Sequence, residues 1–139
     1  YRKIAALIYL ISNGSLTSDG IFFWDEPATN LNPQLIMPII EVLQALALSG
    51  IQIFLATHDY LLSQDLSLLA EYPSNQAVPI KFFSLYHAKR SNRKGGILVE
   101  EGNSLPLVEH NPILAEFAAH HDREVELFCN STSTNRANR

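Results

Sequence analysis

The feature that most constrains this chain is an apolar run that ends in two adjacent carboxylates. Residues 21–24, Ile-Phe-Phe-Trp, lead directly into Asp25 and Glu26, and Pro27 ends the run. A continuous apolar run bounded by turn-forming residues predicts a strand buried on both faces, as in a parallel sheet. Acidic residues at the carboxyl end of such a strand lie where open α/β sheets bind ligands. The stretch therefore predicts an α/β fold with a ligand site at this strand end.

A second apolar run, residues 51–56, predicts a second strand that ends shortly before His58. Between the two strands, Asn32 and Pro33 are suited to the cap and first position of a helix, and Gly50 is suited to its end. Pro38 should bend this helix or delay its regular start. A strand, helix and strand in this order form a right-handed crossover with parallel strands. The apolar face of the connecting helix is Ile36, Ile39, Ile40, Leu43 and Leu46.

The parallel arrangement places Asp25, Glu26 and His58 along one edge of the sheet. An aspartate at a strand end can hold Mg²⁺, and a neighbouring glutamate can polarise a water that attacks a nucleotide phosphate. The alternative is structural: the two carboxylates end a strand and cap a turn, and the histidine caps another strand end.

The rest of the chain predicts further elements around this unit. Residues 4–11 are apolar on nearly every side and predict a buried helix, which Asn13 and Gly14 end. Residues 60–71 predict a short helix, residues 73–76 a loop, and residues 78–87 and 97–100 a β-hairpin. Asn111 and Pro112 open a terminal helix. The apolar side of the short helix is Leu61, Leu62, Leu66 and Leu69, and one face of the terminal helix is Leu114, Phe117, Ala118, His121, Val125 and Phe128.

Composition sets the broad class of the protein. The 139 residues are 47% apolar and 17% charged, with a net charge of −4, which suits a covered α/β domain and argues weakly against dedicated nucleic-acid binding. One cysteine, Cys129, excludes an internal disulfide, so we expect a reducing, cytoplasmic location. No apolar run reaches the ~18 residues of a membrane helix. We expect a single partial domain over residues 1–128 and a disordered tail over residues 129–139.

Three segments together resemble the ABC-type ATPases. Residues 22–27, Phe-Phe-Trp-Asp-Glu-Pro, resemble the Walker B motif, residues 29–33 the D-loop, and residues 54–59 the switch-histidine segment. Residues 2–7 resemble the helix that follows the signature loop in these proteins. The sequence Thr-Asn-Leu-Asn in the D-loop is closer to stand-alone AAA-type ATPases, related to structural-maintenance-of-chromosomes and RecF-like proteins, than to transporter subunits. The resemblance implies the C-terminal part of a P-loop NTPase fold.

The same resemblance implies a role for each matched residue. Asp25 would contact Mg²⁺, Glu26 would be the catalytic base, and His58 would contact the γ-phosphate of ATP. Asn30, Leu31 and Asn32 would lie at the interface of a homodimer and touch the partner's nucleotide.

The chain also departs from the family pattern. It contains no Gly-x-x-x-x-Gly-Lys-Ser/Thr phosphate loop and no signature motif. We therefore expect an N-terminal ATPase segment to supply both, and the isolated 139 residues to be inactive. In the complete ATPase, hydrolysis would drive an effector protein or a nucleic-acid process. The alternatives are a non-catalytic truncated domain that acts as an interaction module, or a fragment of a transporter ATPase subunit.

Other charged residues carry weaker signals. The basic cluster at the hairpin turn is more easily explained as a solvated turn than as a contact for nucleic acid or an acidic partner; it comprises Lys89, Arg90, Arg93 and Lys94. His110, His120 and His121 lack the spacing of a metal site. Cys129 has no neighbours that indicate a nucleophile.

Overall fold

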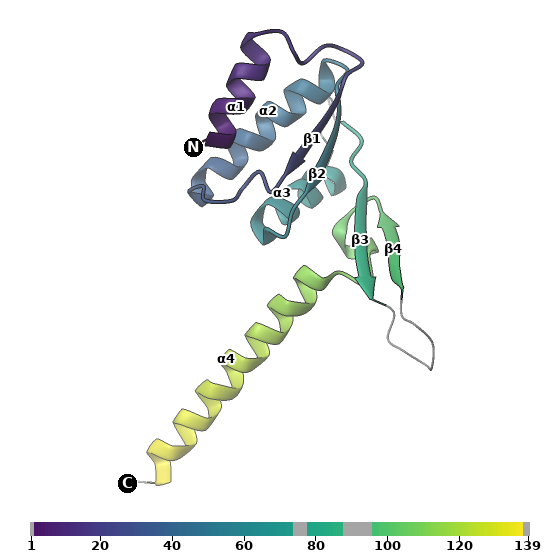
Figure 1. The fold of residues 1–139 in the computed structure, drawn as a ribbon. Helices are drawn as coiled ribbons and strands as arrows, with labels where there is room; N and C mark the ends of the chain where they lie inside the picture. The colour runs from purple at the N-terminus through teal and green to yellow at the C-terminus, as the bar shows by residue number, and fades with distance from the viewer. Residues whose placement is uncertain (1, 74–77, 88–95, 138–139) are drawn as a thin grey trace.

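A computed structural model describes residues 2–73, 78–87 and 96–137 of the chain. Its parallel sheet pairs β1 (Ile21–Asp25) with β2 (Gln52–Ala56), and its antiparallel hairpin pairs β3 (Phe82–His87) with β4 (Ile97–Gly102). The α-helices are α1 (Arg2–Ser12), α2 (Ile36–Leu48), α3 (Tyr60–Glu71) and α4 (Pro112–Ala137). Two short 3-10 helices are η1 (Pro33–Leu35) and η2 (Leu105–Leu107). Figure 1 shows α1 and α2 side by side along the parallel sheet, with α4 projecting away from the rest.

The predicted strand–helix–strand unit is present, with parallel strands. The register places Ile21 opposite Gln52 and Asp25 opposite Ala56. The Asn32 side chain accepts a hydrogen bond from the backbone of Gln34, which caps η1, and α2 follows at Ile36. The regular α-helix therefore begins at Ile36, after η1, and not directly after the Asn32 cap. This agrees with the delayed start expected from Pro38. Gly50, with φ of 98°, ends the helix in a backbone conformation that favours glycine.

Two clusters of buried side chains connect the helices with β1 and with the loop that follows it. The first joins α1, β1 and α2 through Leu7, Trp24, Ile39 and Leu43. The second joins the loop after β1 to α2 and α3 through Ala28, Ile36, Ile40 and Leu62. Together they fix the carboxyl ends of β1 and β2, where the chain turns toward α2 and α3.

The prediction of a strand buried on both faces is wrong for these 139 residues. Trp24 is buried, whereas Phe23 is 72% exposed and lies stacked against Phe54, with ring centroids 4.9 Å apart. Successive side chains of a strand point to opposite faces, and α1 and α2 cover only the face of Trp24. Ile21 is exposed on the same open side.

The prediction that α1 is buried all round is also wrong. Among its side chains only Leu7 is buried, whereas Ile8, Tyr9 and Ile11 are exposed. The helix contacts the sheet along one side only, so its remaining apolar residues face outward. On α3, Leu62 is buried as predicted but Leu61 is 46% exposed.

The hairpin begins later than predicted. β3 starts at Phe82 rather than at Val78, since Pro79 in the intervening segment has no N–H to donate to a strand partner. β4 extends to Gly102, two residues beyond the predicted end. The basic residues at the hairpin turn and most of the predicted loop at residues 73–76 lie outside the described residues.

The terminal helix differs most from prediction. Asn111 caps it as expected, accepting hydrogen bonds from the backbones of Ile113 and Leu114 at 3.0 and 3.3 Å. The helix then continues to Ala137, through most of the segment for which composition predicts disorder. Its predicted apolar face is largely uncovered: Phe117 is 51% exposed and Phe128 is 72% exposed. Among the described residues, no helix combines the length and apolar character needed to cross a membrane.

Candidate functional site

Glu26 and His58 meet just beyond the ends of the two parallel strands. One carboxylate oxygen of Glu26, Oε1, accepts a hydrogen bond from the backbone N–H of His58 at 3.0 Å and lies 2.6 Å from its ring Nδ1. The other oxygen, Oε2, accepts a weaker hydrogen bond from the Thr57 hydroxyl at 3.4 Å. The two residues are 32 positions apart in sequence. The parallel pairing of β1 with β2 brings them together.

The local backbone explains how Glu26 reaches His58. Its N–H donates to the carbonyl of Ala56 at 2.8 Å, which extends the pairing by one residue past the strand. Its φ of 50° lies in the left-handed region, which interrupts the strand alternation and changes the direction of the side chain. Asp59, which caps α3 through a bond from the Leu62 N–H, fixes the chain after His58.

The tautomer of His58 determines which group donates in the Glu26–His58 contact. An ionised carboxylate only accepts hydrogen bonds, so when Glu26 is ionised the donor in this contact is the Nδ1–H of His58. The other ring nitrogen, Nε2, is then available toward solvent, and the His58 side chain is 84% exposed. Glu26 is 23% exposed, so its carboxylate is partly shielded while the histidine ring is accessible.

Asp25 differs from Glu26 in what surrounds its carboxylate. Its side chain is exposed at the end of β1 and forms no hydrogen bond or ion pair with any other described residue. Carboxylate oxygens are ligands that Mg²⁺ prefers, usually one or two of them together with water and substrate phosphates. Asp25 therefore has the donor atoms and the accessibility that a magnesium ligand needs, whereas the oxygens of Glu26 already accept hydrogen bonds.

The three predicted D-loop residues differ in exposure and contacts. Asn30 is exposed, with a positive φ of 61°, and Leu31 packs partly against the first cluster of buried side chains. The Oδ1 atom of Asn32 accepts the Gln34 N–H that caps η1. Asn30 and Leu31 line the same hollow as Glu26 and His58, whereas the Asn32 side chain caps η1.

A hollow of about 480 Å³ connects the strand ends to the predicted D-loop segment. Sequence reasoning missed its aromatic wall, in which Tyr60 of α3 stacks on Phe117 of α4 with ring centroids 4.0 Å apart. It also missed Thr57, which bonds to Glu26. The sequence placed Phe117 on the apolar face of the terminal helix but did not link it to this site, because only tertiary structure brings α4 here. The hollow is lined by Glu26, Ala28, Thr29, Asn30, Leu31, His58, Asp59, Tyr60 and Phe117.

A second titratable cluster lies at the base of the hairpin. Glu100 accepts hydrogen bonds from the backbone N–H groups of Glu109 and His110, both at 2.9 Å, and its Oε2 lies 3.1 Å from His110 Nδ1. The His110 ring stacks on Tyr86, with centroids 4.2 Å apart. The backbone N–H groups are the main cause of a lowered pKa of Glu100. These bonds engage both oxygens of Glu100. The cluster therefore ties β4 to the segment just before α4.

The carboxylate of Glu26 and the ring of His58 lie beyond the carboxyl ends of parallel strands, where open α/β sheets bind ligands. Residues 2–64 match the family model described as "AAA domain, putative AbiEii toxin, Type IV TA system". This match supports the predicted resemblance to a segment of an AAA/ABC-type ATPase domain, without distinguishing the structural-maintenance-of-chromosomes and RecF-like branch.

The matched segment covers less than half of the chain but contains Asp25, Glu26, Asn30 and His58. AAA domains have the P-loop NTPase fold and generally use ATP and Mg²⁺, and the parallel sheet with its helices agrees with that fold. Comparisons with curated proteins and with solved structures gave no match.

Proposed function

We propose that this chain carries the water-orienting half of an ATP-hydrolysing site. The observation that supports it best is the contact between the Glu26 carboxylate and the His58 ring, 2.6 Å apart beyond the ends of two parallel strands. ATP hydrolysis needs a group that orients the attacking water, a metal near the phosphates and a group that contacts the γ-phosphate. Residues of these three kinds lie at the ends of the two strands or directly after them.

In this proposal Glu26 is the general base. Its carboxylate oxygens offer about four lone-pair positions, of which His58 and Thr57 occupy up to three. The remaining position, on Oε2, can accept a hydrogen bond from water and then its proton. His58 orients the Glu26 carboxylate through its contacts with Oε1, and its exposed Nε2, when protonated, can donate to a γ-phosphate oxygen.

Asp25 is the proposed magnesium ligand. The ion, when bound with ATP, supplies positive charge against the phosphate oxygens. Asp25 and Glu26 are adjacent but have different surroundings, since Asp25 is unpaired among the described residues and Glu26 is hydrogen-bonded. The metal and the water can therefore be served by separate carboxylates.

The remaining components of the site come from other polypeptide segments in this proposal. A phosphate loop and a signature motif are absent from the 139 residues, so an additional ATPase segment holds the triphosphate. Asn30, Leu31 and Asn32 face a second copy in a homodimer, and hydrolysis powers an effector protein or a nucleic-acid process. The competing hypothesis is a non-catalytic interaction module, which the open apolar face around Phe23 favours.

The experiment that separates these hypotheses measures ATP hydrolysis by this chain joined to a segment with a phosphate loop and signature motif. We expect Glu26→Gln to reduce the turnover rate by about 100-fold or more, as loss of a general base does, while ATP binding persists. Glu41→Gln, which removes an exposed carboxylate on α2, is the matched control and should hydrolyse ATP normally. Equal rates for the wild type and Glu26→Gln would support the interaction-module hypothesis.

A further inference from the structure

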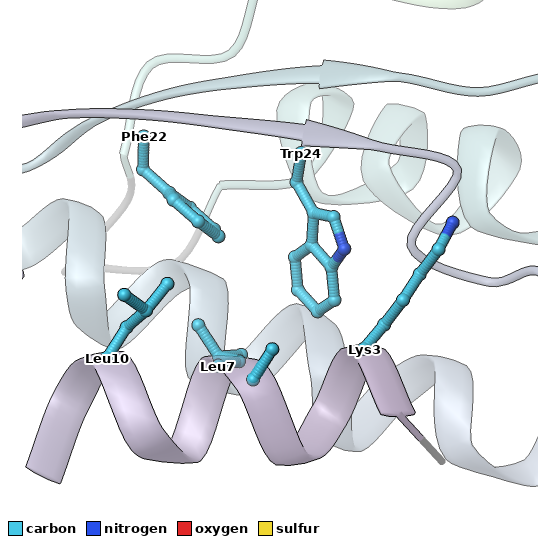
Figure 2. A pocket seen from close by; sticks show the side chains of 6 residues that line it. Lys3, Leu7, Leu10, Phe22 and Trp24 are labelled. Carbon is cyan, nitrogen blue, oxygen red and sulfur yellow. The ribbon is translucent and has the colours of Figure 1, made fainter.

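Lys3 connects α1 to the strand end that carries the two carboxylates. Its ammonium group donates hydrogen bonds to two consecutive backbone carbonyls, 2.8 Å to that of Asp25 and 2.6 Å to that of Glu26. Figure 2 shows the side chain reaching from α1 past Trp24 to the end of β1. No sequence pattern pointed to these two contacts. Lys3 is separated in sequence by 22 positions from Asp25 and by 23 positions from Glu26.

The environment of Lys3 restricts where its ammonium group can lie. The aliphatic part of the side chain borders an apolar depression of about 230 Å³ between α1 and β1. Long basic side chains commonly bury their stem against apolar surface and keep the charged end at a polar group. Here the polar groups are the two carbonyls, so the stem and the head of Lys3 are both held. The depression is lined by Lys3, Ala6, Leu7, Leu10, Phe22 and Trp24.

The strand end needs such a cation for two physical reasons. Two consecutive carbonyl oxygens approach the same point, which concentrates partial negative charge close to the carboxylates of Asp25 and Glu26. Glu26 also has a φ of 50°, a left-handed conformation that is unfavourable for an L-residue with a side chain. Hydrogen bonds from a charged donor are stronger than neutral ones and can offset both costs.

We infer that Lys3 is a positioning residue that holds the Asp25 and Glu26 peptide groups so that the Glu26 carboxylate meets His58. Lys3 touches neither the carboxylate nor the imidazole, so it acts through the backbone. The catalytic part of this inference rests on the proposed ATPase function. The geometric part, that Lys3 maintains the Glu26–His58 contact, stands on the structure and is measurable without ATP.

The geometric part is tested by NMR on the 139-residue chain. In Lys3→Met, which keeps the stem but removes the charge, we expect hydrogen exchange of the His58 amide to accelerate by about tenfold or more. Lys3→Arg, which retains a charged donor, should preserve the slow exchange, and Arg2→Met, a charge removal at the neighbouring exposed position, should not change it. Unchanged His58 exchange in folded Lys3→Met would overturn the inference.

A measurement on the wild type keeps the test decisive if Lys3→Met does not fold. The Lys3 ammonium protons should exchange more slowly than those of Lys81, whose side chain is 48% exposed. Equal exchange rates for the two lysines would contradict the inference.

The catalytic part is tested in the chain joined to a phosphate-loop segment. We expect Lys3→Met to lower kcat by about tenfold with little change in KM for ATP, and Lys3→Arg to restore most of the loss. If Glu26→Gln abolishes hydrolysis while Lys3→Met leaves kcat unchanged, the positioning role fails and the proposed function stands. If the wild type does not hydrolyse ATP, the proposed function fails, and the exchange data alone decide whether Lys3 positions Glu26.

Discussion

Three carboxylates of this chain show how surroundings determine what an acidic side chain can do. Asp25 has no partner among the described residues, so its oxygens are available to a cation. Glu26 is bonded to His58 and Thr57, and keeps capacity for a water molecule on one oxygen. Glu100 is engaged on both oxygens by backbone N–H groups and His110, which makes it structural. The residue type is shared, and the hydrogen-bond partners distinguish the roles.

Glu100 predicts how stability depends on pH. The N–H groups of His110 and Glu109 favour its charged form and lower its pKa from the ordinary value of 4.5. A carboxyl whose folded pKa is lowered stabilises the fold above its ordinary pKa, and the contribution is lost as pH falls through the folded pKa. We expect Glu100→Gln to be less stable than the wild type at neutral pH, with a difference that shrinks below pH 4.5.

Urea denaturation at a series of pH values measures this effect. Glu101→Gln is the matched control, because Glu101 is the adjacent residue and pairs with Lys81 at the surface. A stability difference for Glu100→Gln that stays constant from neutral to acidic pH would contradict the assignment.

At the scale of the element, helix starts are the most predictable features of this chain. Asn32, Asp59 and Asn111 each accept a hydrogen bond from a backbone N–H two or three residues ahead, at the start of η1, α3 and α4. An N-cap works through bonds within a few residues, so tertiary structure has little influence on it.

The Asn111 cap gives a prediction for α4. Asn111 is buried and bonds to the backbones of Ile113 and Leu114. We expect Asn111→Ala to lower the free energy of unfolding by about 1 kcal/mol, because these N–H groups lose their acceptor. Asn111→Ser retains a capping oxygen and should recover most of that loss in chemical denaturation. An alanine variant as stable as the wild type would show that the cap contributes nothing.

At the scale of the whole molecule, the parallel sheet has one covered face and one open face. α1 and α2 pack on the side of Trp24, and the opposite side exposes Phe23. Figure 1 shows both helices on the same side of β1 and β2. Neighbouring aromatic residues of one strand therefore contribute differently to stability.

Two alanine substitutions measure that difference. We expect Trp24→Ala to cost about 3–5 kcal/mol, as removal of a buried aromatic side chain does, because it leaves a cavity against Leu7 and Leu43. Phe23→Ala removes a ring that is 72% exposed and should cost about 1 kcal/mol or less, chiefly through loss of its stacking on Phe54. Similar free energies of unfolding for the two variants would mean that the Phe23 face is buried in solution.

The sequence by itself determined the features that depend on local physics. The apolar runs of β1 and β2, the Asn-Pro helix starts and the glycine at the end of α2 predicted the strand–helix–strand order. That order requires parallel strands, which places Glu26 and His58 at the same edge of the sheet. These predictions succeeded because hydrophobic periodicity and capping act over a few residues.

Only the tertiary structure determined which side chains are covered and which distant residues are in contact. An apolar residue in a strand or helix has the same sequence signal whether or not another element covers it, so the exposure of Phe23, Ile8 and Leu61 could not be predicted. The hydrogen bonds of Lys3 to the end of β1 and the stacking of Phe117 on Tyr60 join distant positions through packing alone. Local sequence patterns therefore identify the residues of the candidate site, whereas long-range packing determines the contacts around them.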